Sequence, residues 1–360
     1  MSRPFDASKF RKSVVKSIDG ISTGFNDPKV WVSTNSYALN YLISGNFNHG
    51  IALGKVAMLA GNSGAGKSLV LANIIRNAQK QGIYCILMDT ENAHDETWLH
   101  AFGVDTTEEK LLKFNVSLIA DAAHIISDFV KDYKALPLDD RPKVLFAIDS
   151  LGMMISSINA QQFAENSLKG DFGSKPKELY ALMRNCVNMF GNLDIGLVCT
   201  NHTSKSQDMF NPDDVIAGGE GPIFAASMVV AMKKGKLKED EEGKKSTDVN
   251  GIRAMCKVMK TRYSKPFEDC EIKIPYATGM DPYSGLTDIF EKHGLLTKDG
   301  NSLCYTSIDG TEFKQFRRAW EQNKNGALDA VMADVMKTPG GLFKRSKNTE
   351  ETEVKQDNAD

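Results

Sequence analysis

Short apolar runs alternate with amphipathic stretches through the middle of this 360-residue chain. Five runs are almost continuously apolar: KVAMLAG, GIYCILMD, PKVLFAID, DIGLVCTN and ASMVVAMKK. Strands that are buried on both faces have this pattern. Three intervening stretches have helical spacing: SLVLANIIRNAQKQG, which ends on Gly82, DAAHIISDFVKDYKAL and ELYALMRNCVNMFGN. The alternation predicts an α/β fold with a mostly parallel central sheet flanked by helices.

The pattern changes outside this central region. Residues 1–45 form a mixed, partly basic segment that we expect to act as an N-terminal arm, and residues 46–280 form the core. Residues 281–337 are expected to make a small C-terminal unit. Residues 338–360 have no apolar periodicity, so we predict a disordered polar tail. Within the core, the charged stretch 234–251 indicates an exposed hairpin or loop between two strands.

The composition is that of an ordinary globular protein, with 41% hydrophobic and 25% charged residues. No apolar run approaches the roughly 20 residues of a membrane helix, and no apolar segment of a secretory signal follows the basic N-terminus. The six scattered cysteines lack metal-binding spacing, which indicates reduced structural thiols in a cytoplasmic protein. Because the net charge is only −2, any DNA-binding surface must be a local patch.

The stretch GNSGAGKS fits the phosphate-binding pattern G-x-x-x-x-G-K-[ST]. A predicted strand precedes it and a predicted helix follows, which argues against a simple Gly-rich turn. Glycines let backbone N–H groups surround phosphate oxygens, the lysine reaches the β- and γ-phosphates, and the serine hydroxyl binds Mg²⁺. The predicted nucleoside triphosphate site consists of Gly61, Asn62, Ser63, Gly64, Ala65, Gly66, Lys67 and Ser68.

Two further apolar strands bring carboxylates to the same predicted edge of the sheet. VLFAIDS ends in Asp149, which we expect to hold a Mg²⁺-bound water, although such a residue can also cap a helix. LMDTENAHDETW places Asp89 and Glu91 at the end of a strand whose carboxyl end meets the phosphate-binding loop in parallel topology. A carboxylate there can activate the water that attacks the γ-phosphate. We favour Glu91 over Asp89 because the geometry suits the first residues beyond the strand.

Asp95 and Trp98 are three residues apart on the expected first turns of the next helix. An aromatic face and a carboxylate can together hold a purine base and its amino group. A core aromatic is the alternative interpretation of Trp98.

Several blocks, in order, resemble the bacterial RecA recombinases and, more closely, their phage UvsX branch: LMDTENAHDETWLHAFGVD, LFAIDSLG and LVCTNHTSKSQDMFNPDDVIAGGEGPIFAAS. MDPYSGLTDIFEKHGLL is similar to the segment that closes the RecA core, and the resemblance covers roughly residues 35–295. It implies a RecA-type P-loop core in which Glu91 is the catalytic glutamate and Asp95 and Trp98 hold adenine. It also implies that His202 senses the γ-phosphate where bacterial members have a glutamine. From the residues alone, a surface histidine would be the default.

The resemblance implies two DNA-binding loops, at about residues 156–178 and 203–219. Both look structureless, and long structureless segments inside a compact domain are usually functional. Lysines can meet phosphates, and aromatic side chains stacked on bases contribute about 1–3 kcal/mol each. Incidental lysines on disordered loops are the alternative, and the arginines of bacterial members after the first loop are not clearly reproduced, Arg184 being the nearest. The candidate DNA contacts are Lys169, Lys175, Lys177, Lys205, Met209, Phe210, Gly218 and Gly219.

The segment KVMKTRYSKPF predicts a cationic strand that ends near Lys260 and Arg262. From composition alone these residues would belong to a solvated face. In the family, two basic residues at this position reach the nucleotide of the neighbouring subunit, which is arginine-finger chemistry worth about 10³–10⁵ in rate elsewhere. Hydrolysis would then depend on a head-to-tail filament. The N-terminal segment, with Phe5 and Phe10, is the expected docking arm.

The sequence therefore predicts an ATP-dependent DNA recombinase that forms filaments on single-stranded DNA and pairs it with homologous duplex DNA. The resemblance implies a single-strand binding protein and a loader as partners, and a phage origin would place the protein in the host cytoplasm. A ring-forming helicase and a non-catalytic ATP-gated DNA-binding or assembly module are the alternatives. The acidic end, residues 350–360, either restrains duplex binding or keeps the protein soluble. The expected catalytic residues are Glu91, Lys67, His202, Lys260 and Arg262, acting with ATP and Mg²⁺.

Overall fold

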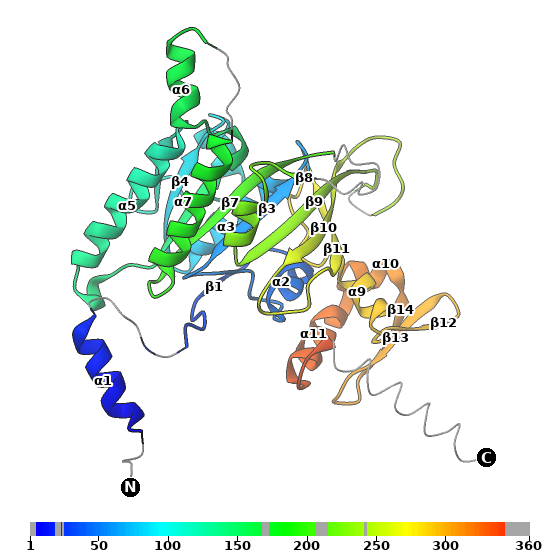
Figure 1. Cartoon of the computed structure of the whole chain (residues 1–360). Coiled ribbons are helices and arrows are strands. Elements are labelled where there is room, and N and C mark those ends of the chain that lie inside the picture. Colours follow the sequence, from blue (N-terminus) through cyan, green and yellow to red (C-terminus); the bar gives the residue numbers. More distant parts are fainter. Residues whose placement is uncertain are drawn as a thin grey trace.

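The computed structural model describes residues 5–18, 23, 25–167, 173–205, 215–240 and 243–342. Figure 1 shows a central sheet with helices on both sides, a helix near the N-terminus that stands away from the core, and a small unit near the C-terminus. Among the described residues, no helix combines the length and the apolar content needed to cross a membrane. Four of the predicted features lie outside the described residues: Lys169, Met209, Phe210 and residues 343–360 of the tail.

Nine strands of the described residues make up the main sheet: β3 (Val56–Gly61), β4 (Tyr84–Asp89), β5 (Leu111–Asn115), β6 (Val144–Asp149), β7 (Ile195–Ser204), β8 (Val215–Ile216), β9 (Met228–Leu237), β10 (Gly251–Lys260) and β11 (Asp269–Pro275). Their order is β11-β10-β9-β3-β7-β6-β4-β5, and β8 pairs with β7. The six strands from β9 to β5 in this order are parallel, whereas β8, β10 and β11 pair antiparallel. The predicted mostly parallel sheet is confirmed.

Helices cover both faces of this sheet. The helices of the core region are α2 (Tyr37–Ser44), α3 (Lys67–Lys80), α4 (Glu96–Ala101), α5 (Ile119–Ala135), α6 (Ser157–Ala164), α7 (Ser174–Phe190) and α8 (Glu220–Ala225), with short 3-10 turns η1 (Leu138–Asp140) and η2 (Leu151–Met153). Met58 and Phe146 pack with α5 and α7 on one face. Leu59 and Leu145, which point the other way, pack with α2 and α3. This double burial explains why the central parallel strands are almost continuously apolar over their buried positions.

The five predicted strands and three predicted helices are present as β3, β4, β6, β7, β9, α3, α5 and α7. Asp89, at the end of β4, pairs in register with Asp149, at the end of β6, so the predicted common edge is confirmed. The charged stretch 234–251 contains the turn between the antiparallel strands β9 and β10, as predicted. All six cysteines are free, and burial raises the pKa of the Cys85 and Cys186 thiols to about 12, as expected of structural thiols.

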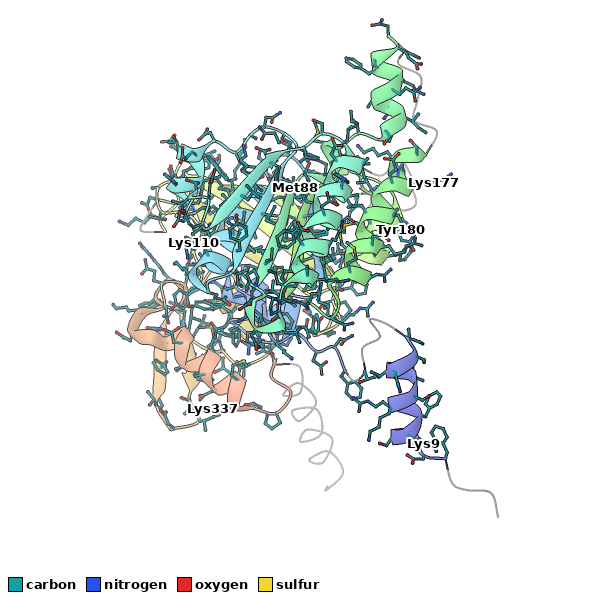
Figure 2. All side chains as sticks on the ribbon, turned by 90° about the vertical axis from the view of Figure 1, so that its left-hand side faces the viewer. Lys9, Met88, Lys110, Lys177, Tyr180 and Lys337 are labelled. Atoms are coloured by element: carbon teal, nitrogen blue, oxygen red, sulfur yellow. The ribbon has the colours of Figure 1, made fainter. Side chains whose placement is uncertain are left out.

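Part of the segment predicted as an N-terminal arm, residues 1–45, packs into the core. Helix α1 (Ala7–Ser17) has no buried residue, and Figure 2 shows it, with Lys9, set apart from the core. Farther along, β1 (Trp31–Val32) pairs with β2 (Ile51–Ala52), and the apolar helix α2 is almost wholly buried. The chain therefore joins the core well before residue 45.

The predicted C-terminal unit contains a three-stranded antiparallel sheet and three helices of the described residues: β12 (Thr297–Asp299), β13 (Ser302–Thr306), β14 (Glu312–Phe316), α9 (Leu286–Lys292), α10 (Arg317–Glu321) and α11 (Ala327–Lys337), with the 3-10 turn η3 (Lys324–Gly326). The packed chain continues beyond residue 337. Leu342 is buried, and its backbone N–H donates to the Tyr41 hydroxyl at 2.8 Å. One apolar side chain thus anchors residues 338–342, which the prediction assigned to the tail, to the core.

The first predicted DNA loop, residues 156–178, is not structureless as expected. Residues 157–164 form α6, which rises above the core in Figure 1, and residues 174–178 already belong to α7. The Ser156 side chain caps α6 by accepting from the Asn159 N–H. Because α6 buries none of its residues, it has no apolar stripe from which the sequence could have predicted it. The two ends of the second predicted loop, residues 203–219, pair as a short antiparallel hairpin in which Thr203 lies opposite Ile216.

Candidate functional site

The phosphate-binding loop connects β3 to α3, and its glycines fit closely packed surroundings. Gly64 and Gly66 have φ angles of 73° and 91°, in the left-handed region that favours glycine. A Cβ at Gly61 would lie 2.3 Å from the carbonyl oxygen of Met232, and a Cβ at Gly66 would lie 2.9 Å from Ile274 Cδ1. The neighbouring strands β9 and β11 thus leave no room for a side chain at two of the motif glycines.

Lys67 points back over the loop to which it belongs. Its Nζ donates to the carbonyl oxygens of Gly61 at 2.8 Å and Asn62 at 3.1 Å. Burial lowers the pKa of the Lys67 ammonium, and the nearby carboxylates of Asp149 and Glu91 oppose that shift. Phosphate oxygens can replace these two carbonyl oxygens as partners of the Lys67 ammonium, so the loop fits a triphosphate.

Asp149 is almost fully buried at the end of β6. Its carboxylate accepts hydrogen bonds from the hydroxyls of Thr200 and Ser68 and contacts His94 Nε2 at 2.8 Å. Burial acts to raise the pKa of Asp149, but the three hydrogen bonds outweigh it, so the pKa is lowered. Asp149 does not cap a helix, because Ser150 is the cap of η2. An ionised carboxylate beside the Ser68 hydroxyl fits Mg²⁺, which prefers oxygen ligands.

Both carboxylate oxygens of Asp89 are engaged in contacts within the fold. Oδ1 accepts from the backbone N–H groups of Glu91 at 3.1 Å and Ala93 at 3.3 Å. Oδ2 accepts from the backbone N–H of His94 at 3.0 Å and lies 3.1 Å from Lys113 Nζ. Burial acts to raise the pKa of Asp89, but these contacts lower it overall. Asp89 therefore shapes the loop after β4, whereas no such set of backbone contacts holds Glu91 among the described residues.

Glu91 projects from that loop toward the end of β7. Its Oε1 lies 3.0 Å from His202 Nε2 and accepts a hydrogen bond of 2.9 Å from Ser150 Oγ. The side chains of Glu91 and His202 are each about one-third exposed, at 35% and 32%. A Cβ at Gly152 would lie 2.8 Å from His202 Cδ2, so the histidine ring packs directly on η2. The structure brings together Glu91 and His202, as the predicted pair of base and sensor requires.

The predicted adenine contacts lie at the start of α4. Asp95 caps this helix by accepting from the Trp98 N–H at 2.7 Å. The half-buried Trp98 ring packs between His94 and Phe102, with ring centroids 4.9 and 4.7 Å away. Asp95 is exposed. Trp98 thus has the contacts of a core aromatic on part of its surface, and its role toward a base stays a prediction.

The described candidates for DNA contact differ in their surroundings. Lys205 is exposed, whereas Lys175 Nζ donates to the Gly152 carbonyl of η2 at 2.6 Å. Gly218 has a φ angle of 87°, and a Cβ there would lie 2.9 Å from Leu179 Cδ1. Gly219 is the residue before α8. The packing of the second loop on α7 therefore gives a structural reason for glycine at these two positions.

Lys260 lies far from the phosphate-binding loop of its own chain. Lys260 pairs with Val229, which pairs with Met58, three residues before the end of β3. Relative to Gly61 at the end of β3, Lys260 thus lies about 10 Å back along the strands and two strand spacings of about 4.8 Å across the sheet. Its Nζ donates to the carbonyl oxygens of Ile223 at 3.1 Å and Phe224 at 2.8 Å. Lys260 is therefore not placed to contact a nucleotide held by the same chain.

Four residues of the site were not predicted: His94, Ser150, Thr200 and Thr203. Thr203 Oγ1 donates to Asn62 Oδ1 at 2.5 Å, which ties the phosphate-binding loop to the end of β7. Thr200 and Thr203 are the first and last residues of TNHT, and the polar end of an otherwise apolar strand was a weak signal for them. His94 stands in a polar loop, where nothing in the sequence marks it as buried.

Comparison with known proteins places this geometry in a family. The RecA N-terminal domain matches residues 26–281, more than half of the chain. The chain is 27% identical over 279 residues to the recombination and repair protein of Enterobacteria phage T4, covering 77% of this chain and 67% of that protein. It is 23% identical over 295 residues to Protein RecA of Rhodococcus jostii, covering 80% and 78%. For DNA repair protein recA homolog 3 of Arabidopsis thaliana mitochondria, identity is 23% over 306 residues, covering 81% and 64%.

The matched segment contains the phosphate-binding loop, Glu91, Asp149, His202, Lys260 and both predicted DNA loops. The match in sequence agrees with the arrangement of the phosphate-binding loop, Glu91, Asp149 and His202 at one edge of the sheet, and the chain belongs to the RecA family.

Proposed function

We propose that this protein is a DNA-dependent ATPase that forms filaments on single-stranded DNA and catalyses homologous pairing and strand exchange. The observation that carries the proposal is a continuous path of hydrogen bonds from the nucleotide site to the second loop. Asn62 in the phosphate-binding loop accepts from Thr203, and Thr203 pairs with Ile216 at the far end of that loop. Asn201 Nδ2 donates to the Ala217 carbonyl at 2.8 Å. One short hairpin therefore touches both sites.

ATP hydrolysis follows from the residues at the sheet edge. Lys67 exchanges its two carbonyl partners for oxygens of the β- and γ-phosphates. Ser68 and Asp149 would hold Mg²⁺, which when bound offsets the negative charge of the phosphates. The Glu91 carboxylate accepts a proton from the water that attacks the γ-phosphorus, and the bond from that phosphorus to the bridging oxygen breaks. Ser150 and His202 hold the Glu91 carboxylate in place for this proton transfer.

The state of the γ-phosphate reaches DNA through His202. Its imidazole contacts Glu91, and its backbone carbonyl accepts from the Ala217 N–H at 2.9 Å. A shift of His202 toward the γ-phosphate would therefore move residue 217 and the loop that it closes. In this proposal the hairpin takes two positions, as elements that link ligand sites do. In this proposal ATP favours the DNA-gripping state and hydrolysis releases it.

Filament assembly completes the active site. Lys260 is directed at α8 of its own chain, so we place its contact, and that of Arg262, on the nucleotide of the next subunit. Helix α1 is the proposed connecting arm, since Phe5 and Phe10 are 78% and 60% exposed. A head-to-tail contact that does not close generates a helical filament. A single-strand binding protein and a loader are proposed as accessory partners on the basis of family resemblance.

The proposal is tested by ATP hydrolysis without DNA, with single-stranded DNA and with duplex DNA, over a salt series. We expect strong, salt-sensitive stimulation by single strands that rises cooperatively with protein concentration. A Lys67→Ala variant should lose productive ATP binding. The wild type should pair single-stranded DNA with a homologous duplex, and Lys67→Ala should not. High turnover without DNA would point to a ring-forming motor, and ATP binding without turnover would point to an ATP-gated module; either result overturns the proposal.

A further inference from the structure

A buried histidine outside the predicted site lies between the base-binding region and the metal carboxylate. His94 is 6% exposed. Its backbone N–H donates to Asp89 Oδ2 at 3.0 Å, and its ring lies against Trp98 with centroids 4.9 Å apart. Nε2 is 2.8 Å from Asp149 Oδ2. Backbone, ring face and ring nitrogen are therefore each fixed by a different partner.

The hydrogen bond between His94 and Asp149 has a defined direction. An ionised carboxylate only accepts hydrogen bonds, so Nε2 must carry the hydrogen. Thr200 holds Oδ1 of the same carboxylate, and His94 holds Oδ2. The rotation of the Asp149 side chain is thus set from both sides by residues that come from different elements, the loop after β4 and the strand β7.

The second nitrogen of His94 indicates that packing stability is not the reason for a histidine here. Nδ1 is buried and has no hydrogen-bond partner among the described residues. A buried ring nitrogen without a partner reduces stability, and an apolar residue of similar size would avoid that loss. Asp149 is the polar partner that the His94 ring contacts, so the benefit of the imidazole must arise at that carboxylate.

We propose that His94 is a positioning residue that orients the Asp149 carboxylate toward Mg²⁺ and connects that carboxylate to the Trp98 ring. The proposal rests on the proposed function in taking ATP with Mg²⁺ as the ligand. Groups that hydrogen-bond to metal-binding side chains fix their orientation, and their removal typically costs about 10–100-fold in metal affinity. The contact between His94 and Trp98 also means that a base seated on Trp98 would limit the movement of the imidazole.

The test uses the full-length protein without DNA and a fluorescent ADP analogue. Nucleotide affinity is measured by titration without Mg²⁺ and over a series of Mg²⁺ concentrations, because the gain in affinity caused by Mg²⁺ reports metal binding in the site by linkage. His94→Leu removes the donor at similar volume, and His94→Gln keeps a donor at similar reach. His124→Leu is the matched control, since His124 is 78% exposed on α5 and lies 3.4 Å from Asp128.

We expect His94→Leu to reduce the gain in nucleotide affinity caused by Mg²⁺ by about tenfold or more, with Mg²⁺-free affinity within about twofold of wild type. His94→Gln should recover most of the gain, and His124→Leu should behave as wild type. An unchanged gain in His94→Leu, or equal loss in His94→Gln and His94→Leu, overturns the role of the hydrogen bond. Failure of the wild type to bind the nucleotide at all would instead refute the proposed function.

Discussion

The Glu91 carboxylate and the His202 imidazole, 111 residues apart in the sequence, lie 3.0 Å apart in the fold. Glu91 belongs to the loop after β4, and His202 lies on β7, which leads into the second loop. Ser150, at the end of β6, donates to the same carboxylate oxygen. Three strand ends thus converge on one oxygen, and this convergence is the basis of the first predictions.

Replacing Glu91 with glutamine should nearly stop ATP turnover while ATP and DNA binding persist. Glutamine keeps the size of the side chain but does not accept a proton, and general base catalysis contributes about 10²–10⁴ in rate. Single-turnover hydrolysis and equilibrium nucleotide binding separate the two effects. Normal hydrolysis by Glu91→Gln would move the base to another carboxylate.

Replacing Asp89 with asparagine should instead destabilise the fold. Its two oxygens accept from three backbone N–H groups and contact Lys113, and breaking such a buried charged cluster costs about 3 kcal/mol. Urea unfolding of the variant and the wild type at neutral pH measures the difference. If Asp89→Asn keeps its stability but loses turnover, Asp89 rather than Glu91 acts in catalysis.

Replacing His202 with alanine should remove the stimulation of hydrolysis by single-stranded DNA more than it weakens nucleotide binding. The substitution leaves the backbone hydrogen bond to Ala217 in place but deletes the contact with Glu91. His202→Gln should retain stimulation, since an amide can still donate to the carboxylate. The measurement is turnover with and without DNA, and similar stimulation in wild type and His202→Ala would exclude a sensor role.

Replacing Lys260 with alanine should abolish DNA-stimulated hydrolysis, and a mixture of variants can show that Lys260 acts on a neighbouring subunit. Lys67→Ala lacks its own nucleotide site but supplies an intact Lys260. In an equimolar random filament about one quarter of the contacts would join a sound nucleotide site to a sound Lys260. Turnover should therefore reappear in the mixture. No recovery, with both variants still binding DNA, would place Lys260 outside trans catalysis.

Replacing Asp334 with asparagine should weaken the C-terminal unit in a pH-dependent way. Asp334 is buried, and its Oδ2 accepts from Tyr305, Ser307 and the Ile308 N–H at 2.8, 2.5 and 2.8 Å. Burial acts to raise the pKa of Asp334, but these bonds lower it below its ordinary value of 3.8.

A carboxyl group with a lowered folded pKa stabilises the fold above its unfolded pKa, and that contribution is lost as pH falls through the folded value. Asp334→Asn should therefore reduce the free energy of unfolding by about 1–2 kcal/mol at pH 7. The difference from the wild type should shrink as the pH falls below about 4. Urea unfolding across this range checks the prediction, and a difference independent of pH would assign it to packing.

Local patterns in the sequence determined the parts of this protein whose residues act through short-range geometry. The motif GNSGAGKS defines the phosphate-binding loop because its glycine conformations and the following helix are properties of adjacent residues. Continuous apolar runs identified the parallel strands, since burial on both faces demands them. From strand order alone, Asp89, Glu91 and Asp149 could be assigned to one edge of the sheet.

Tertiary structure decided which of these side chains can act and which are used to hold the fold. Asp89 and Glu91 are two residues apart and chemically alike, and only the packing of the loop after β4 engages one and leaves the other beside His202. Helix α6 was missed because an exposed helix has no apolar stripe, and Leu342 extended the packed chain through a single long-range contact. His94 became visible only through its contact with Asp149, because the burial of a polar residue depends on what the rest of the chain places around it.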